Sequence, residues 1–143
     1  MTTKYFKHNN KFKMNFIEQL NQDYKIILAS ASPRRSHLLT SIGLQFEVMP
    51  SDIVEPDFDL SPTKYCTKNA ILKAEAVLQK VDSTTPTLII SADTIVVLKN
   101  TIINKPTDEE DAFRTLKKLS NRIHVVYTGV CVINTSNNKK LSK

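Results

Sequence analysis

Two adjacent arginines lie where the sequence predicts the start of a helix. Arg34 and Arg35 follow Ser30, Ser32 and Pro33, directly after a short apolar run. Serine followed by proline is typical of a helix start, where unpaired N–H groups and a partial positive charge gather. Cations are disfavoured there unless an anion binds, and phosphate oxygens match the guanidinium fork. On local evidence alone, an exposed basic turn paired with nearby carboxylates is an equally good interpretation.

Two carboxylates and two lysines further along the chain could serve the same anion. Asp93 follows the apolar residues 88–90, a common place for ligand sites in α/β proteins, although a turn or capping role explains this residue alone better. Lys73 lies on an apolar helical stripe, which is awkward for a cation unless it snorkels or meets an anion. Glu55 in an acidic loop and Lys105 before a helix start look locally like ordinary solvated residues.

Together these residues suit the cleavage of a phosphoanhydride bond. The set consists of four cations and two acids: Arg34, Arg35, Lys73, Lys105, Glu55 and Asp93. The cations could hold a polyphosphate, and the acids could bind a divalent metal through oxygen or deprotonate a water. Catalysis of this kind rests mainly on positioning and on stabilising charge.

A strand and a helix should position the arginines. Residues 26–29 predict a buried strand, and Pro33 begins a helix that Gly43 ends. Three apolar side chains of this helix should face the core: Leu38, Leu39 and Ile42. Alternation over residues 45–49 predicts a second strand.

A longer helix should carry Lys73. Ser61 and Pro62 begin it after the acidic loop of residues 50–60, and it runs to about Lys80. Four residues at helical spacing form its inward stripe: Ala70, Lys73, Ala74 and Val77.

The second half of the chain predicts four strands and one helix. The strands are residues 87–91, 95–98, 101–103 and 124–134. Asp93 should lie just past the end of the first of these, and Lys99 with Asn100 should turn a hairpin. Thr107 and Glu110 form a capping box for a helix that ends near Ser120. The order β-α-β-α-β-β-α-β predicts an α/β fold.

Composition is that of an ordinary globular domain. The chain has 143 residues, 41% of them hydrophobic and 24% charged. No apolar run approaches the roughly 20 residues of a membrane span, so we expect a cytoplasmic protein without a membrane partner. The net charge of +6 favours an anionic partner, but no aromatic-interleaved basic patch suggests nucleic acid. Cys66 and Cys131 predict buried free thiols in a reducing compartment.

A series of segments resembles the Maf family of nucleoside triphosphate pyrophosphatases. Residues 28–35, Leu-Ala-Ser-Ala-Ser-Pro-Arg-Arg, resemble the family signature. Further matches follow in the family's order: residues 51–55, Ala70 with Lys73 and Ala74, residues 92–96, Lys105-Pro106, residues 119–124 and residues 128–130. The resemblance extends over about residues 25–135.

The resemblance implies an enzyme that hydrolyses nucleoside triphosphates to monophosphate and pyrophosphate with Mg²⁺, Mn²⁺ or Co²⁺. The Ser-Pro-Arg-Arg and Ala-Asp-Thr forms are similar to the branch acting on dTTP and UTP, with non-standard nucleotides as further substrates. Asp93 is the implied proton acceptor, Glu55, Lys73 and Lys105 are implied catalytic residues, and Glu55 and Asp93 are implied metal ligands. The implied phosphate-binding residues are Ser30, Ser32, Arg34, Arg35 and Thr94. A homodimer is compatible with the family.

The resemblance also implies a domain organisation and a fold. Residues 1–24 would be a flexible N-terminal extension, 25–136 a partial Maf-like domain, and 137–143 a polar tail. The fold would be a mixed central sheet flanked by helices, as in Maf and ITPase proteins, and incomplete at its C-terminus. Because family members continue with a base-recognising segment, the alternative expectation is a shortened, catalytically impaired nucleotide-binding remnant. Asn121 replaces a family glycine and tolerates a positive φ at that position.

Overall fold

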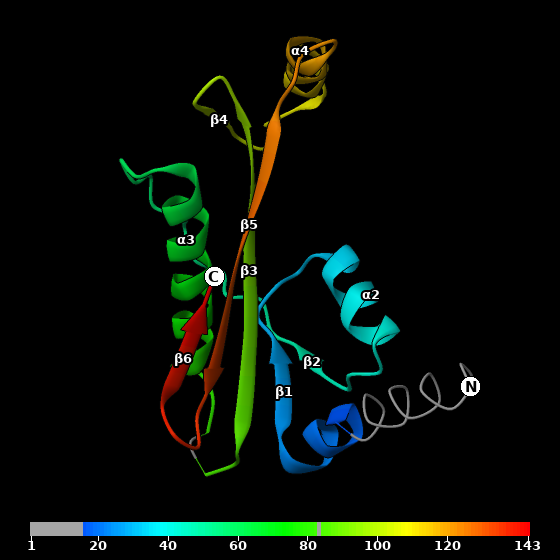
Figure 1. Ribbon diagram of the computed structural model, residues 1–143, viewed down its shortest axis with the longest axis vertical. Helices are drawn as coiled ribbons and strands as arrows, with labels where there is room; N and C mark the ends of the chain where they lie inside the picture. The colour runs from blue at the N-terminus through cyan, green and yellow to red at the C-terminus, as the bar shows by residue number, and fades with distance from the viewer. Residues whose placement is uncertain (1–15, 83) are drawn as a thin grey trace, which may run out of the picture.

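A mixed β-sheet forms the centre of the protein in a computed structural model that describes residues 16–82 and 84–143 (Figure 1). Its strands are β1 (Lys25–Leu28), β2 (Glu47–Val48), β3 (Thr87–Leu98), β4 (Thr101–Ile103), β5 (Val125–Asn134) and β6 (Lys139–Ser142). The order along the sheet is β2-β1-β3-β5-β6, and β4 pairs with β3. β1 runs parallel to β2 and β3, whereas the β3–β4, β3–β5 and β5–β6 pairs are antiparallel. The predicted mixed sheet flanked by helices is confirmed.

Three helices, α2 (Pro33–Ser41), α3 (Pro62–Leu78) and α4 (Glu109–Leu119), surround this sheet. Figure 1 shows α3 lying lengthwise beside β3 and β5, with α2 across the sheet beside β1 and α4 at the far end of the β3–β5 pair. Residues 16–23 of the extension expected over 1–24 are helical, and Asn21 of this helix donates from Nδ2 to the Gly43 carbonyl at 2.9 Å. The part of that extension before residue 16 lies outside the described residues. Among the described residues, no helix is both long and apolar enough to cross a bilayer.

The core lies between α3 and the sheet. Ala70, Ala74 and Val77 of the predicted stripe are fully buried, and they pack with a cluster that includes Ile27, Ala29, Ile89, Cys131 and Ile133. Alternate β3 residues face this helix, because successive side chains of a strand point to opposite faces. Both cysteines are buried free thiols, as expected. The predicted helix over 61–80 and the strand over 26–29 are therefore confirmed within two residues.

Turns and helix ends follow the local chemistry. Gly43 has φ +86° where the predicted helix stop lies, and Lys99 and Asn100 both have positive φ in the predicted hairpin. Asn121 has φ 54°, the conformation expected where it replaces glycine. The capping box prediction is one residue too early: Asp108, not Thr107, caps α4 by accepting from the Asp111 N–H at 2.7 Å.

β3 is one continuous strand, so the expectation that Asp93 follows a strand end is wrong. β3 pairs with β5 without a break from Leu88, opposite Asn134, to Val97, opposite Val125. This ladder satisfies the backbone groups of β3 that point toward β5, and the carboxylate is tolerated inside the strand because a lysine pairs with it.

The apolar face predicted for α2 is also wrong. Leu38 and Ile42 are exposed, and Leu39 is only partly buried. The strand predicted over 45–49 shortens to β2, which has only two residues because it pairs with just the last two residues of β1.

The polar segment of residues 137–143 contains a strand, so the strand over 124–134 is not the last one described. β6 pairs with β5 from Cys131 opposite Ser142 to Asn134 opposite Lys139. All four β6 residues are exposed, so composition does not reveal this edge strand. Lys140 of β6 also bonds to Glu75 of α3, which raises the pKa of Lys140.

Candidate active site

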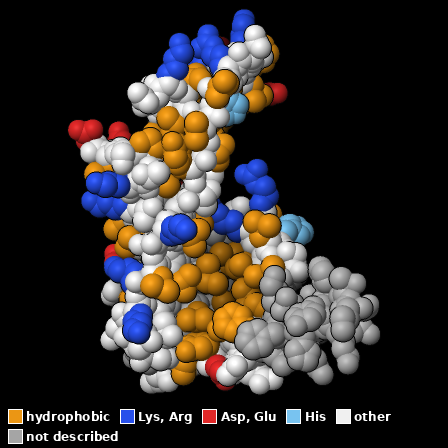
Figure 2. Space-filling view, in the orientation of Figure 1, with side chains coloured by type: hydrophobic (Ala, Val, Ile, Leu, Met, Phe, Trp, Pro, Cys, Tyr) orange, Lys and Arg blue, Asp and Glu red, His pale blue; other side chains and the backbone are white. Residues whose placement is uncertain are grey.

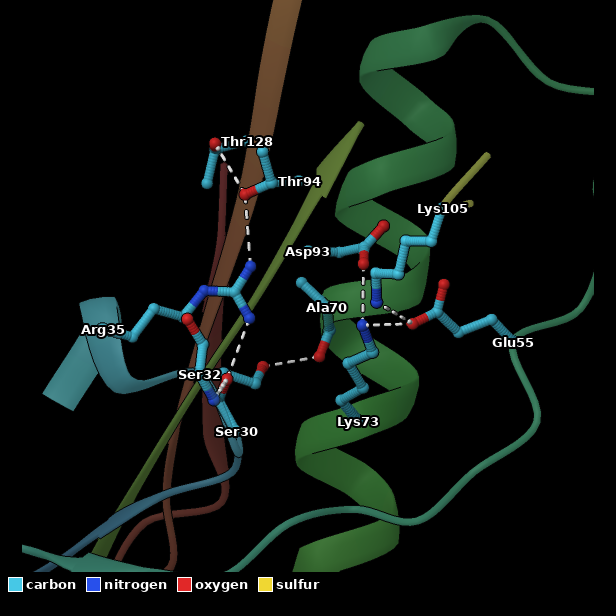
Figure 3. A network of polar contacts seen from close by, with 11 residues as sticks. Ser30, Ser32, Arg35, Glu55, Ala70, Lys73, Asp93, Thr94, Lys105 and Thr128 are labelled. Carbon is cyan, nitrogen blue, oxygen red and sulfur yellow. Dashed lines mark hydrogen bonds and ion pairs between the residues drawn. The ribbon is translucent and has the colours of Figure 1, made fainter. Parts of the chain in front are cut away.

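Lys73 lies between two carboxylates. Its Nζ is 2.7 Å from Glu55 Oε1 and 2.7 Å from Asp93 Oδ1 (Figure 3). The side chains of Lys73, Glu55 and Asp93 are 12%, 34% and 5% exposed, so this ion pair network is largely removed from water. The inward stripe of α3 puts the lysine here, and its position among alanines is explained by the two acids it meets. A buried charge without such a partner is strongly destabilising.

Asp93 belongs to the set of β3 residues that face α3. Its Oδ1 accepts from Lys73. Its Oδ2 is buried and has no hydrogen-bond partner within the described residues. Buried polar atoms of native proteins are nearly always bonded to protein, water or ligand, so this oxygen is available to a further donor.

Glu55 and Lys105 reach the same place from loops. Glu55 lies in the irregular segment before α3, and Lys105 Nζ is 3.9 Å from Glu55 Oε1. Burial raises the pKa of Glu55, but the hydrogen bond and charge of Lys73, with the charges of Lys105 and Arg35, outweigh it and lower the pKa overall. The 85% exposure of Lys105 makes its pair with Glu55 weak.

Arg35 is held by hydroxyl groups from two separate elements. Its Nη1 donates to Ser30 Oγ at 2.9 Å, and its Nη2 donates to Thr94 Oγ1 at 3.1 Å. Ser30 Oγ also accepts from the Ser32 N–H at 3.3 Å, which ties the loop to the guanidinium. Burial lowers the pKa of Arg35; Asp93 opposes this effect, Arg34 adds to it and Glu55 opposes it. An arginine so placed keeps its positive charge.

Arg34 and Ser32 lie at the start of α2. Arg34 is exposed, and its charge is felt by Arg35. Ser32 occupies the N-cap position of α2, as predicted, but its side chain makes no capping hydrogen bond. In this first turn Pro33 has no N–H, and the N–H groups of Arg35 and Ser36 donate to the Ser32 carbonyl. The positive end of the helix dipole and the two guanidinium groups are therefore what suits an anion here.

The two clusters meet at an open stretch of β3. β1 pairs with β3 only as far as Ile90, and β4 pairs with it again from Val96. Between these points the described strands leave one edge of β3 unpaired. Asp93 and Thr94 are consecutive there, so their side chains point to opposite faces, toward Lys73 and Arg35 respectively.

The structure thus brings together most of the residues singled out in the sequence. Glu55, Lys73 and Asp93 are in direct contact, and Lys105 approaches Glu55. Ser30, Ser32, Arg35 and Thr94 form the adjoining hydrogen-bonded group. Arg34 lies near enough for its charge to act on Arg35.

Two neighbouring residues were not predicted as parts of the site. Thr128 Oγ1 is 3.0 Å from Thr94 Oγ1, the hydroxyl that holds Arg35. Gly129 pairs with Asp93, and a Cβ there would lie only 2.4–2.5 Å from the backbone of Cys66 and Thr67 on α3. Glycine therefore permits the close helix–strand approach that lets Lys73 reach Asp93. The Thr-Gly-Val motif was the available signal.

Comparison with known proteins finds relatives that carry the name "dTTP/UTP pyrophosphatase". The chain is 48% identical over 114 residues to a "dTTP/UTP pyrophosphatase" of Caldicellulosiruptor saccharolyticus, covering 78% of this chain and 57% of that protein. Proteins of the same name from Ruminiclostridium cellulolyticum and Thermoanaerobacter sp. are 47% and 41% identical, each over 118 residues, covering 81% and 82% of this chain. The chain spans 57–61% of the length of these three curated relatives.

Among solved structures, the Ham1 protein of Staphylococcus aureus aligns with a TM-score of 0.44 and 17% identity, covering 82% of this chain and 67% of that chain. The family model described as "Maf-like protein" matches residues 25–143. This match spans the sheet, α2 to α4, and both clusters of the candidate site. The chain therefore belongs to the Maf-like protein family.

Proposed function

We propose that this protein takes part in hydrolysing nucleoside triphosphates to monophosphate and pyrophosphate, with dTTP- and UTP-like nucleotides as substrates. The observation that carries the proposal is the contact of Lys73 with Glu55 and Asp93 at equal distances, beside the anchored Arg35. The relatives named dTTP/UTP pyrophosphatase support the choice of substrate. Non-standard nucleotides of similar shape are further candidates.

Phosphate binding is assigned to the α2 start and its surroundings. Arg35 donates two hydrogen bonds to protein hydroxyls, which fix its plane and leave further N–H groups for a phosphate. Arg34 and the positive end of the α2 dipole add positive potential on the same side. Ser30, Ser32 and Thr94 serve mainly by orienting this segment and the guanidinium group.

Asp93 is the proposed proton acceptor. A water oxygen attacks phosphorus, the bond between the α- and β-phosphates breaks, and pyrophosphate leaves with the bonding electron pair. Oδ2 of Asp93 takes the proton of that water, because it is the carboxylate oxygen that Lys73 does not bind. Lys73, Arg35 and Lys105 stabilise the negative charge that develops on the phosphate oxygens.

The acids also fit a divalent cation of the Mg²⁺ type. The described residues contain no cluster of three or more His, Cys, Asp or Glu side chains suited to a metal. Mg²⁺ in phosphate-binding enzymes needs only one or two carboxylates, since waters and substrate phosphates complete its shell. Glu55 and Asp93 would be those ligands. When bound, the cation would neutralise phosphate charge.

A direct assay tests the proposal. The purified chain is incubated with dTTP or UTP and Mg²⁺ or Mn²⁺, and released pyrophosphate is measured. We expect turnover that is lost in Asp93→Asn, because an amide cannot accept the proton. Pyrophosphate release no faster than in this variant would contradict the proposed function.

A further inference from the structure

A buried amide on α3 has no hydrogen-bond partner among the described residues. The side chain of Asn69 is completely buried, and neither its Nδ2 nor its Oδ1 has a hydrogen-bond partner. In the described part of the chain, the buried side-chain atoms without a partner are these two and Asp93 Oδ2. A buried amide without a hydrogen bond destabilises the folded state. We therefore expect Asn69 to have a hydrogen-bond partner in the folded protein.

Packing places Asn69 at the level of Asp93. One turn before it, the backbone of Cys66 and Thr67 packs on Gly129, the residue paired with Asp93. Directly after it, the Ala70 carbonyl accepts the hydroxyl hydrogen of Ser91 on β3. Asn69 lies between these contacts along α3.

Two further observations bring the Asp93 carboxylate to this part of α3. Lys73 lies four residues after Asn69, on the same side of the helix, and reaches Asp93 at 2.7 Å. Burial raises the pKa of the Cys66 thiol, and the negative charge of Asp93 raises it further. The Asp93 carboxylate therefore acts on Cys66 in the turn before Asn69 and on Lys73 in the turn after it. The amide of Asn69 lies between these two turns of α3.

We propose that Asn69 is a positioning residue for Asp93, and that its Nδ2 donates through one buried water to Asp93 Oδ2. A water with two or more polar neighbours is the usual solution for buried groups of this kind. Lys73 then holds one carboxylate oxygen and the water holds the other. A carboxylate oxygen has two lone pairs, so Oδ2 still has one for the proton of the attacking water. The catalytic consequence rests on the proposed function.

The first experiment asks whether the two side chains are coupled in the folded protein, with no need for activity. Asn69→Leu removes the amide at similar volume, and it is combined with Asp93→Ala in a double-mutant cycle of urea unfolding. We expect the effects on the folding equilibrium to be non-additive by about fivefold or more. Val77→Ala, which removes volume at another fully buried position of the same helix face, should be additive with Asp93→Ala.

The second experiment separates positioning from general stability. With dTTP as substrate, the single variant Asn69→Leu should have a kcat about tenfold or more below that of the wild type and a KM within about twofold of it. The reason is that a misplaced proton acceptor slows the chemical step and not substrate binding. Val77→Ala should leave both parameters unchanged at a temperature where it is folded. A crystal structure should show the water within hydrogen-bonding distance of Asn69 Nδ2 and Asp93 Oδ2.

Additive folding effects together with an unchanged kcat in Asn69→Leu would overturn the proposal and leave Asn69 as an unsatisfied core residue. If Asn69→Leu does not fold, Asn69→Ala replaces it in the same cycle. A wild-type chain without pyrophosphatase activity would count against the proposed function alone, since the folding cycle would still decide whether Asn69 and Asp93 are coupled.

Discussion

Two regions of the protein differ in how well they are packed: the body, where α3 lies against the sheet, and the distal end, which carries β4 and α4. In the body, α3 lies against β3 and β5 and buries Ala70, Ala74 and Val77 completely. At the distal end, α4 has no buried residue, and Phe113 and Leu116 are 67% and 68% exposed. Figure 2 shows apolar side chains on the surface both there and over the lower part of the sheet.

The comparison also divides the candidate site. Lys73 and Asp93 belong to the packed body, whereas Lys105 follows β4 at the distal end and touches Glu55 only at 3.9 Å. Replacing residues of the same chemical type should therefore change the free energy of unfolding by different amounts in the two regions. The two lysines provide the sharpest case.

Replacing Lys73 should have the largest effect. Lys73→Met leaves the buried Asp93 without its cation, and we expect the free energy of unfolding to fall by about 3–5 kcal/mol. Lys105→Met, the matched change at the exposed lysine, should alter it by less than about 1 kcal/mol. Urea unfolding of both variants measures the difference, and equal losses would remove the distinction between the two regions.

Gly129→Ala should come next. The added Cβ would meet the α3 backbone at 2.4–2.5 Å, so helix and strand must separate. We expect a loss of about 1–3 kcal/mol in stability. Val126→Ala, on the distal part of the same strand, removes an exposed side chain and serves as control. Thermal unfolding compares them, and an undisturbed Gly129→Ala would mean that α3 packs less closely than described.

Alkaline pH should weaken the body through its thiols. Burial raises the pKa of Cys66 and of Cys131 above the ordinary value of 9.0. A raised folded-state pKa contributes stability that is complete below the unfolded pKa and is lost as pH rises through the folded pKa. Each thiol should therefore reduce stability above about pH 9 by at most about 1.4 kcal/mol per pH unit. Unfolding at pH 8 to 10 should show a shallower loss in Cys131→Ala than in wild type.

A polar change at the distal end should have the smallest effect. Phe113→Ser replaces an exposed side chain of α4, so stability should change by no more than about 0.5 kcal/mol. Unfolding measured at several protein concentrations checks this. A loss of 2 kcal/mol or more would show that Phe113 is covered in solution, and the contrast with the body would not hold.

Sequence predicts the elements whose patterns are strong and local. The stripe of α3 has helical spacing and β1 is a continuous apolar run, so burial follows from these local patterns. The hairpin at Lys99 and Asn100 and the stop at Gly43 follow from residues that tolerate positive φ.

The predictions that were wrong depend on strands distant in sequence or on two local patterns that compete. Nothing around Asp93 indicates that β5 pairs along the whole of β3, and β6 is held by pairing and not by apolar residues. Thr107 and Asp108 are both favourable N-cap residues, and only the folded helix selects Asp108.

For the candidate site, residue chemistry alone supported an anion site and an exposed basic turn equally for Arg34 and Arg35. For Glu55 it favoured an ordinary solvated loop residue. Ordered motifs resembling a known family singled out the set, and the structure confirms that Glu55, Lys73 and Asp93 touch. Asn69 escaped notice because a buried asparagine among alanines has no pattern that separates it from a surface residue.

The unbroken course of β3 has one last consequence. Asp93 and Thr94 are neighbours on a single strand, so the carboxylate on one face and the hydroxyl that holds the Arg35 guanidinium on the other are joined by one peptide unit. Their separation cannot change without breaking the ladder to β5. A ligand lying across the unpaired edge would meet both groups already preorganised, without waiting for any hinge or lid to bring them together.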